Sequence, residues 1–396
     1  MSVPASSAPA PPLHDPHFFT SDESLRAFQQ LRAEAPVYWH PTPGFWTLTR
    51  LDDVVAVSRD PATFCSGRGV LLSDRARDIA PRQSIIYMDP PEHGKYRKLV
   101  QPAFTPGRLR ALEARITETA RSLLARLEPG RPCDLVDAFA APLPMLVIAD
   151  LLGVPGSDRA QFKLWSDAII EAGSTPTEEN MAQSMELLAY FSSVLAERRV
   201  SPGDDLISVL VDSEVDGERL EEFDLLMFCM TLLVAGNETT RNLISHGAHA
   251  LATHPAERVQ LVADAARLPR AIEEMLRWGS PIMSFMRTAT CDTSVRGTPI
   301  RAGEQLLLLY AAANRDESVF GADAEAFSIA RDSARHVAFG FGEHFCLGAA
   351  LARMEGRIAF AELLARFPKI EMAGPIERLP SLFLRGVVRL PLVLSA

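Results

Sequence analysis

The chain has 396 residues, of which 47% are hydrophobic and 23% charged, and its formal net charge is −10. This composition is ordinary for a globular protein with a large core, and the negative charge argues against a general affinity for nucleic acid. The five cysteines are scattered and include no Cys-x-x-Cys pair. Their arrangement argues against a disulfide framework or a cysteine-rich zinc site and favours a reducing compartment.

The first 15 residues are predicted to form a disordered tail, because they are rich in Ala, Pro and Ser and lack a long apolar run. Residues 16–396 are expected to form a single domain, since neither an internal repeat nor a clear linker follows the tail. No secretory signal is visible, and the longest apolar run, Leu225 to Ala235, is too short to cross a bilayer. We therefore expect a cytoplasmic monomer without a membrane span.

The N-terminal part is predicted to mix strands and helices. Residues 37–40 and 45–49 flank a turn with Pro and Gly, which predicts a β-hairpin, and a short helix is expected at residues 52–59. From residue 94 to residue 367 apolar side chains recur mostly at helical spacing, and residues 218–254 predict one long buried helix. Short strands are predicted at residues 290–295, 306–310 and 387–394. The expected fold class is mainly α with small β-sheets (α+β).

The segment from Phe339 to Gly348 has the pattern Phe-Gly-x-Gly-x-His-x-Cys-x-Gly, and an apolar helical stripe begins at Leu347. Glycines permit backbone N–H groups to approach the Cys346 sulfur closely, such contacts tune a bound metal, and a helix N-terminus favours a thiolate. The pattern predicts a thiolate ligand for a metal, and haem iron bound by a cysteine thiolate activates oxygen. A buried structural cysteine beside a glycine-rich turn is the alternative, which the specificity of the pattern disfavours.

This segment resembles the haem-binding signature of cytochromes P450, and further motifs of that family occur in the right order over about residues 16–394. The resemblance implies the cytochrome P450 fold, with haem b between the long central helix and the helix that follows the cysteine loop. It implies that Cys346 is the axial ligand of the iron, that Phe339 packs beside the haem, and that His344 contacts a propionate. Gly340 and Gly348 are expected to contribute to the same cofactor site.

A second motif, Ala235-Gly236-Asn237-Glu238-Thr239-Thr240, lies in the middle of the predicted long helix. An acid and a hydroxyl are costly in a buried helix unless they are satisfied or used. A Thr-rich patch with Glu238 facing solvent is the alternative. The segment resembles the oxygen-binding motif of the family, which implies that Ala235 lies at the haem. It also implies two catalytic residues, Thr239 stabilising the bound oxygen and Glu238 relaying protons.

Glu274 and Arg277 are three residues apart and would face each other on a helix. An ordinary surface ion pair of this kind contributes little. In this position along the chain the two residues resemble the Glu-x-x-Arg pair of the family, which an arginine before the haem loop completes. Arg331 fits that position, and the resemblance implies a structural role for all three.

Haem carries two propionates, and arginine is suited to bidentate contact with carboxylates. His93 and Arg97 are four residues apart and would share a helix face. Together with Arg287 they resemble the propionate-binding residues of the family. Each of the three taken alone would more ordinarily be a solvated surface group.

The resemblance implies a haem-thiolate monooxygenase that takes O2 as co-substrate and inserts one oxygen atom into a C–H bond. Electrons are expected from a separate ferredoxin and ferredoxin reductase, with NAD(P)H used only indirectly, because the sequence leaves no room for flavin or iron–sulfur domains. Residues 205–211, 214–220 and 271–278 resemble mycobacterial P450s that oxidise sterol side chains. Macrolide or polyketide tailoring, a peroxide-driven peroxygenase and a non-catalytic haem sensor are the alternatives.

The substrate is expected to be bulky and hydrophobic, such as a steroid, a terpenoid or a fatty acyl chain, since the walls implied by the resemblance are apolar. These walls are residues 71–88, Ile169, Ile170, 232–235, 281–285 and 382–383. A basic docking patch for ferredoxin is a further hypothesis, with scattered solvated charge as its alternative. The patch would contain Lys95, Lys98, Arg108, Arg353 and Arg357.

Overall fold

The computed structural model describes residues 11–76, 84–174 and 177–396. Helices make up most of the fold and the strands form small sheets, which confirms the predicted class. The α-helices of the described residues are α1 (Glu23–Glu34), α2 (Leu51–Ser58), α3 (Glu92–Val100), α4 (Pro106–Ala125), α5 (Pro142–Leu151), α6 (Arg159–Ser174), α7 (Glu178–Val200), α8 (Leu206–Asp212), α9 (Glu222–Thr253), α10 (Pro255–Ala263), α11 (Leu268–Gly279), α12 (Tyr310–Ala313), α13 (Glu317–Phe320) and α14 (Ala349–Arg366).

The largest sheet has five strands in the order β1-β2-β10-β7-β3, in which only β2 and β10 run parallel. Its strands are β1 (Val37–His40), β2 (Phe45–Leu48), β3 (Phe64–Cys65), β7 (Ser284–Ala289) and β10 (Gln305–Leu309). A three-stranded sheet contains β4 (Pro132–Asp134), β14 (Pro391–Ser395) and β11 (Lys369–Met372). Two-stranded pairs are formed by β5 (Glu214–Val215) with β6 (Glu218–Arg219), β8 (Thr293–Val295) with β9 (Thr298–Ile300), and β12 (Glu377–Arg378) with β13 (Val387–Arg389).

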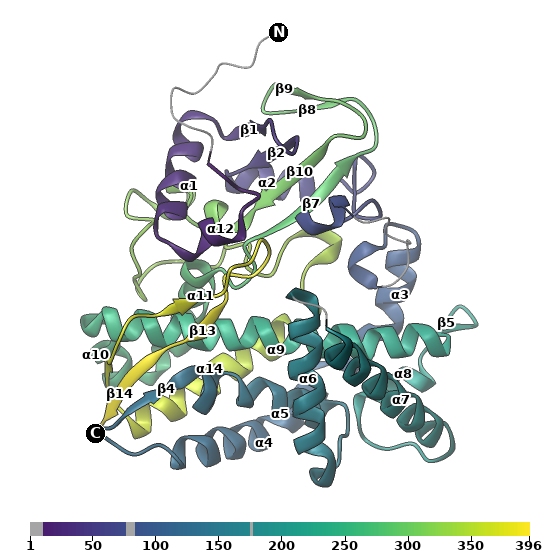
Figure 1. Ribbon diagram of the computed structural model, residues 1–396, viewed down its shortest axis with the longest axis vertical. Coiled ribbons are helices and arrows are strands. Elements are labelled where there is room, and N and C mark those ends of the chain that lie inside the picture. Colours follow the sequence, from purple (N-terminus) through teal and green to yellow (C-terminus); the bar gives the residue numbers. More distant parts are fainter. Residues whose placement is uncertain (1–10, 77–83, 175–176) are drawn as a thin grey trace.

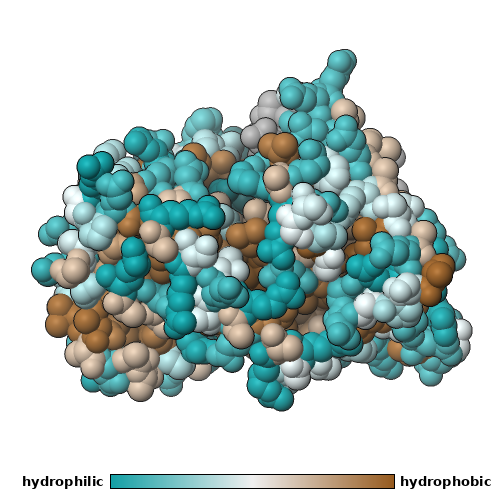
Figure 2. Space-filling model, turned by 90° about the horizontal axis from the view of Figure 1, so that it is seen from below, coloured by the Kyte–Doolittle hydropathy of each residue, from teal (hydrophilic) through white to brown (hydrophobic). Residues whose placement is uncertain are grey.

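Figure 1 shows two regions, with α9 running through the lower, helical one. Helices α4, α5, α6, α7 and α14 gather around α9, while the five-stranded sheet lies in the upper region with α1, α2 and α12. The face seen from below is mainly hydrophilic, and apolar residues show in separate spots on it (Figure 2). Among the described helices, none combines the length and the apolar character that crossing a membrane requires.

The predicted hairpin is confirmed, because Val37 in β1 pairs with Leu48 in β2, and the short helix after it is α2. The long helix begins at Glu222 rather than at residue 218, since β5 and β6 form a small hairpin first. Asp216 and Gly217 at its turn have φ angles of +56° and +81°, which is the left-handed conformation of a two-residue hairpin turn.

Two of the predicted strands were wrongly delimited. β7 ends at Ala289 and β8 begins at Thr293, so the chain turns within the segment that was predicted to be one strand over residues 290–295. The segment 387–394 is broken at Leu390 into β13 and β14, and β14 begins with Pro391. Proline is tolerated at the first residue of a strand because it donates no ladder hydrogen bond there.

Of the predicted disordered tail, residues 1–10 lie outside the described residues, and the prediction is wrong for residues 11–15. Leu13 is completely buried, and the Pro11 carbonyl lies 3.0 Å from the His40 Nε2 atom. Asp15 caps a short 3₁₀-helix, Pro16–Thr20, by accepting from the His17 N–H. The apolar Leu13 side chain therefore anchors the chain before the boundary that composition suggested.

Candidate active site

The cysteine loop is closed by its own backbone. The Cys346 N–H donates to the Phe339 carbonyl at 2.9 Å, and the Phe345 N–H donates to the Gly342 carbonyl at 3.1 Å. Gly348 is the N-cap residue of α14, so Cys346 lies three residues before the first residue of that helix, Ala349. The loop therefore presents Cys346 near the N-terminal end of α14, as the sequence predicted.

Opposing influences act on the Cys346 thiol. Burial has the largest effect and raises the pKa of this thiol, while a hydrogen bond from the Gly348 backbone and the positive charges of Arg97 and Arg353 partly oppose it. A metal ion bound to the sulfur would lower the pKa of the thiol further, as the two arginine charges do. The surroundings of Cys346 thus already contain the groups that stabilise a thiolate.

Two glycines of the loop adopt a left-handed backbone, with φ of +69° at Gly340 and +73° at Gly342. They differ in their surroundings. A Cβ on Gly342 would lie 2.2 Å from the Ser58 carbonyl oxygen at the end of α2, whereas the nearest atom to a Cβ on Gly340 is the Tyr310 hydroxyl oxygen at 3.7 Å. Gly342 is therefore the point at which the loop backbone packs directly on a neighbouring backbone.

One face of α9 is open in its middle, although most of this helix is buried. Ala235 is exposed, and Leu232, Gly236 and Thr239, which share its face, are half-buried. The Thr239 hydroxyl donates to the Ala235 carbonyl at 2.6 Å. This bond lies within the helix and leaves the lone pairs of the Thr239 oxygen available on the open face.

The contacts between α9 and α14 indicate which part of α14 lies nearest to this open face of α9. A Cβ on Gly247 would lie 2.4 Å from the Phe360 ring, and a Cβ on Gly356 would lie 3.0 Å from Leu243. A step of four residues along α9 therefore matches a step of four along α14. Continuing this register toward the N-terminus brings Thr239 and then Ala235 toward the start of α14, where the cysteine loop ends.

Glu238 is buried beside Thr239, and neither of its carboxylate oxygens has a hydrogen-bond partner among the described residues. Arg241 Nη1 lies 2.8 Å from Glu238 Oε1, which is an ion-pair distance without hydrogen-bond geometry. Burial raises the pKa of Glu238, the Arg241 charge opposes this, and Asp167 adds to it. A carboxyl in this environment holds a proton more readily than an exposed one. The alternative in which Glu238 faces solvent is excluded.

The structure brings the four predicted propionate ligands together. His93 and Arg97 come from α3, Arg287 from β7 and His344 from the cysteine loop. The His93 and His344 rings lie 4.2 Å apart. Burial lowers the pKa of His93 to about 4 and that of His344 to about 2, and both arginine charges add to each shift.

This cluster contains polar atoms that the described protein atoms do not satisfy. His93 Nε2 is buried without a hydrogen-bond partner among the described residues. Among the described residues, the Arg287 side chain donates only to its neighbour, the Met286 carbonyl, at 2.7 Å. Arg97 donates to the carbonyls of Glu343 and Phe345 at 3.0 and 2.7 Å, which ties α3 to the cysteine loop. The cluster suits an anionic group.

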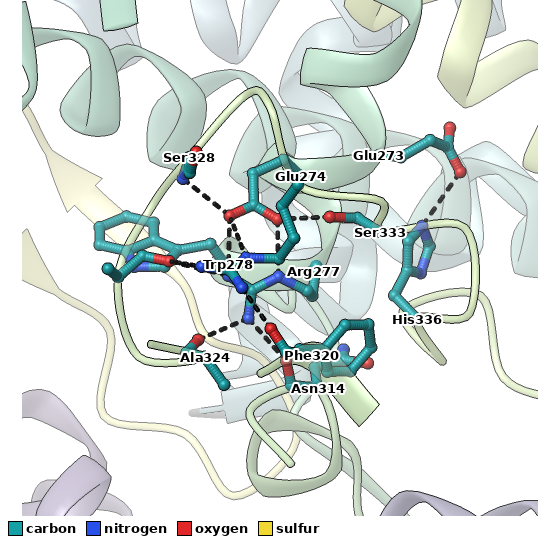
Figure 3. Close-up of polar contacts among 12 residues, drawn as sticks. Glu273, Glu274, Arg277, Trp278, Asn314, Phe320, Ala324, Ser328, Ser333 and His336 are labelled. Carbon is teal, nitrogen blue, oxygen red and sulfur yellow. Dashed lines mark hydrogen bonds and ion pairs between the residues drawn. The ribbon is translucent and has the colours of Figure 1, made fainter. Parts of the chain in front are cut away.

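Figure 3 shows Glu274 paired with Arg277. Both side chains are completely buried, and the Nε–Oε2 and Nη2–Oε1 distances are 2.6 and 2.7 Å. Arg277 also donates to the carbonyls of Asn314, Ala324 and Ala326. Glu274 accepts from the Ser328 N–H at 2.9 Å and from the Ser333 hydroxyl. The alternative of a surface pair is excluded, because both side chains are buried. Their hydrogen bonds fix the chain that leads into the cysteine loop.

Arg331 lies where the sequence placed it, with its Nε atom 3.4 Å from Glu274 Oε1. It makes stronger contacts with Asp323, at 2.9 and 3.0 Å, and donates to the Phe320 carbonyl. Arg331 therefore holds the end of α13 at least as firmly as it holds the ion pair.

Comparisons of the sequence and the fold with known proteins identify the family of this chain. The sequence profile described as Cytochrome P450 matches residues 259–391. Methyl-branched lipid omega-hydroxylase of Mycobacterium tuberculosis is 40% identical over 399 aligned residues, covering 96% of this chain and 93% of the relative. Steroid C26-monooxygenase of Mycolicibacterium smegmatis is 38% identical and covers 96% and 94%. The structure of cytochrome P450 CYP109Q5 from Chondromyces apiculatus matches with a TM-score of 0.88 at 37% identity, covering 97% and 98%. The chain belongs to the cytochrome P450 family.

Cytochromes P450 carry a haem whose iron is bound by a cysteine thiolate, and they use O2. The chain is accordingly a P450 monooxygenase, an oxidoreductase. The residues present fit this cofactor. The His93 Nε2 atom, which has no partner among the described residues, can donate a hydrogen bond to a propionate, and the Arg287 charge complements it. Cys346 lies in a loop whose backbone already hydrogen-bonds to its sulfur.

Several of the predicted pocket walls of this P450 are adjacent. The Phe285 and Phe383 rings lie 5.2 Å apart, and the Met283 N–H donates to the Phe383 carbonyl at 2.8 Å. The Thr231 hydroxyl on α9 lies 3.2 Å from the Ser84 hydroxyl, so the described end of the 71–88 segment also contacts α9. Residues 77–83 and the Ile170 side chain lie outside the described residues.

The sequence analysis missed the side chains that support the predicted ligands. Asp89 accepts from the N–H groups of Ser66 and Gly67 at 2.7 and 2.9 Å, and the Ser66 hydroxyl lies 3.1 Å from His344 Nε2. Glu273 accepts from Arg353 and His336 beside the cysteine loop. Asp89 directly before the two prolines and Glu273 directly before Glu274 were visible as acidic residues, but their partners are distant in sequence.

Proposed function

We propose that this P450 monooxygenase inserts one oxygen atom of O2 into a C–H bond of a bulky apolar substrate, with Cys346 as the thiolate ligand of haem b. One observation supports this most strongly. Cys346 in its closed loop, the group of His93, Arg97, Arg287 and His344, and the open face of α9 come from distant parts of the sequence, and Arg97 joins that group to the loop. When bound, haem b supplies the reductive activation of O2, which a thiolate ligand favours.

The chain's own residues would hold that cofactor from two sides. His93, Arg97, Arg287 and His344 would bind the propionates by charge-assisted hydrogen bonds. On the loop side, Phe339 would pack beside the macrocycle, and the Gly348 N–H would keep its hydrogen bond to the sulfur. Gly340 and Ala235 would leave room, because neither carries a large side chain.

Thr239 and Glu238 would handle protons on the open face of α9. The Thr239 Oγ1 atom donates to the Ala235 carbonyl and can accept from, or switch its proton toward, a group on the open face. Glu238, whose pKa is raised by burial, can pick up a proton and pass it on as a general acid. Once Glu238 has passed its proton on, the Arg241 charge would stabilise the carboxylate that remains.

The identity of the ligand is tested by the spectrum of the reduced protein with carbon monoxide. We expect a Soret band at the long-wavelength position typical of thiolate ligation, and its loss in Cys346→His. Cys133→Ser is the matched control, because Cys133 is half-buried on β4, away from the cysteine loop. A thiolate band that survives in Cys346→His would contradict the proposal.

The role of Thr239 is tested by the coupling of electron supply to product. In Thr239→Ala, product formed per NADPH consumed should fall by about tenfold or more, with the difference appearing as hydrogen peroxide. Thr253→Ala is the control, because the Thr253 hydroxyl makes the same kind of bond, to the His249 carbonyl, at the end of the same helix. Unchanged coupling in Thr239→Ala would remove the oxygen-activating role and favour the peroxygenase alternative.

The substrate class is proposed from the apolar walls and from the relatives. The curated relatives named above act on a methyl-branched lipid and on a steroid, and the described walls include Phe285, Phe383 and Leu232. We expect a steroid, terpenoid or branched fatty acyl chain to shift the haem spin state of the loaded protein at micromolar concentration. A shift with a macrolide and none with these lipids would replace the lipid class by the polyketide-tailoring alternative.

Electrons are proposed to come from a ferredoxin and its reductase. The structure changes which basic residues remain candidates for docking, because Arg353 pairs with Glu273, Arg357 with Glu113 and Lys95 with Glu218. Within the described part of the chain, Lys98 and Arg108 form no ion pair, and Arg108 donates to the Asp204 carbonyl at 3.3 Å.

We expect Lys98→Glu to raise the KM for a [2Fe–2S] ferredoxin severalfold while peroxide-driven turnover stays constant. Lys369→Glu, the same charge change on β11, is the control. Equal KM values in the two variants would exclude Lys98 from docking.

A further inference from the structure

Glu273 joins three segments beside the cysteine loop, and none of its contacts belongs to the Glu274–Arg277 ion pair. Arg353 on α14 donates to both of its oxygens, from Nε and Nη2, at 2.8 Å each. His336, which precedes the loop, places its Nε2 atom 3.2 Å from Glu273 Oε2, and Figure 3 shows the imidazole ring directed at the carboxylate. Glu273 itself comes from α11.

The hydrogen bonds define the protonation of this group. The Ala338 N–H donates to His336 Nδ1 at 3.1 Å, and because a backbone N–H can only donate, Nδ1 carries no proton. His336 Nε2 therefore carries the proton and donates to Glu273. Burial by itself would raise the pKa of Glu273, but the hydrogen bonds from Arg353 and His336 outweigh burial and lower it to about 2.

Arg353 is held against the cysteine loop by a second contact. Its guanidinium carbon lies 4.6 Å from the centre of the Phe339 ring, and the Phe339 carbonyl accepts the Cys346 N–H at 2.9 Å. The Arg353 charge is also one of the charges that act on the Cys346 sulfur. Glu273 thus pins a cation at a site where that cation influences the proposed thiolate.

We propose that Glu273 is a positioning residue that fixes Arg353 beside Phe339 and offsets its charge, so that the Arg353 charge does not raise the reduction potential of the haem bound to Cys346. This inference rests on the proposed role of Cys346. Reduction adds an electron, and a fixed positive charge nearby stabilises the more electron-rich state. Arg353 alone therefore raises the potential, and Glu273 lowers it.

The test is a spectroelectrochemical titration of the purified, haem-loaded protein. Glu273→Gln keeps the shape of the side chain and removes its charge, and should shift the midpoint potential upward. Arg353→Gln should shift it downward. The double variant should return close to the wild-type value, because both charges are then gone.

Glu362→Gln is the matched control. Glu362 lies on the same helix, α14, and accepts a bidentate pair from Arg121 at 2.8 and 2.9 Å. Its loss should leave the potential unchanged. A purely structural role for Glu273 would instead move both single variants in the same direction, because either substitution loosens the same contacts.

Potentials that move together, or that do not move, overturn the inference. If Glu273→Gln fails to take up haem, Arg353→Gln alone must still lower the potential, and failure to do so overturns it equally. The carbon monoxide spectrum separates this result from the proposed function. A normal thiolate band with unmoved potentials refutes only the role of Glu273, whereas a wild-type protein without that band refutes both.

Discussion

Substitution of Gly342 by alanine should be the most damaging single-methyl change in the cysteine loop. Gly342 has a φ of +73°, and its added Cβ would lie 2.2 Å from the Ser58 carbonyl oxygen and 3.0 Å from the Ser58 carbonyl carbon. Both atoms belong to the backbone at the end of α2, so no rotamer change can relieve the overlap. Either α2 or the loop must move.

The magnitude follows from two contributions. The left-handed backbone costs a non-glycine residue about 1–2 kcal/mol, and forcing a methyl group into packed surroundings costs about 1–3 kcal/mol more. Gly342→Ala should therefore destabilise the protein by about 2–5 kcal/mol. Gly340→Ala, with a φ of +69° and no atom closer than 3.7 Å, should lose only the backbone contribution of about 1–2 kcal/mol.

A third glycine supplies the internal control. Gly348 has an ordinary φ of −84°, and the nearest atom to an added Cβ is the Cys346 sulfur at 4.0 Å. Gly348→Ala should change stability by less than about 0.5 kcal/mol. Urea unfolding of the three haem-loaded variants, together with their haem content, measures the loss of stability. This loss should be largest for Gly342→Ala, smaller for Gly340→Ala and smallest for Gly348→Ala. Equal stability of Gly342→Ala and Gly340→Ala would refute the claim that contact with α2 determines the loop position.

Three further outcomes are expected. Glu274→Gln should destabilise the protein by about 3–5 kcal/mol in urea unfolding, since it leaves the buried Arg277 charge uncompensated; a loss below about 1 kcal/mol would contradict this. The Glu273 pKa is lowered to about 2 in the folded protein. The ionised Glu273 side chain therefore stabilises the folded protein at pH values above its ordinary pKa of 4.5, and this stabilisation is lost as the pH falls from 4.5 toward 2. The thermal midpoint of Glu273→Gln should therefore lie below that of the wild type at pH 7, and the gap should narrow below about pH 4.5. Arg287 is a buried cation whose side chain donates to the Met286 carbonyl. Arg287→Leu should therefore stabilise the haem-free protein, yet the haem-loaded variant should release haem to apomyoglobin faster than the wild type. A variant in which both the stability of the haem-free protein and the retention of haem decrease would show that Arg287 is purely structural.

The local motifs were sufficient to select the principal residues of the proposed site. Cys346, Thr239 and the Glu274–Arg277 pair each lie within a short pattern whose spacing has a physical meaning, such as three residues for two facing side chains on a helix. The convergence of His93 and Arg97 with Arg287 and His344 was predicted only through the resemblance. Spacing within one helix says nothing about a partner in a strand nearly 200 residues later.

The supporting residues could not be predicted in the same way. Glu273 and Glu274 are adjacent acids, and sequence alone does not show that one faces Arg277 while the other faces Arg353, 80 residues away. The start of α9 was missed for a local reason, since the Asp216-Gly217 turn signal was overridden by the apolar periodicity that follows it. The buried Leu13 was missed because composition averages over a segment and does not register one anchoring side chain.

Two adjacent residues of α11, Glu273 and Glu274, make separate sets of contacts with the chain that leads to Cys346. Consecutive residues on a helix point about 100° apart, so Glu274 fixes the segment around Ser328 and Ser333, while Glu273 fixes His336 and Arg353. The Glu274 contacts include a buried ion pair whose loss costs stability. The Glu273 contacts hold charge close to the sulfur. The position of the thiolate and the charge around it can therefore be changed independently. Opposite shifts of the reduction potential in Glu273→Gln and Arg353→Gln, without the large stability loss expected for Glu274→Gln, would show that Glu274 positions the loop while Glu273 controls the charge near the sulfur.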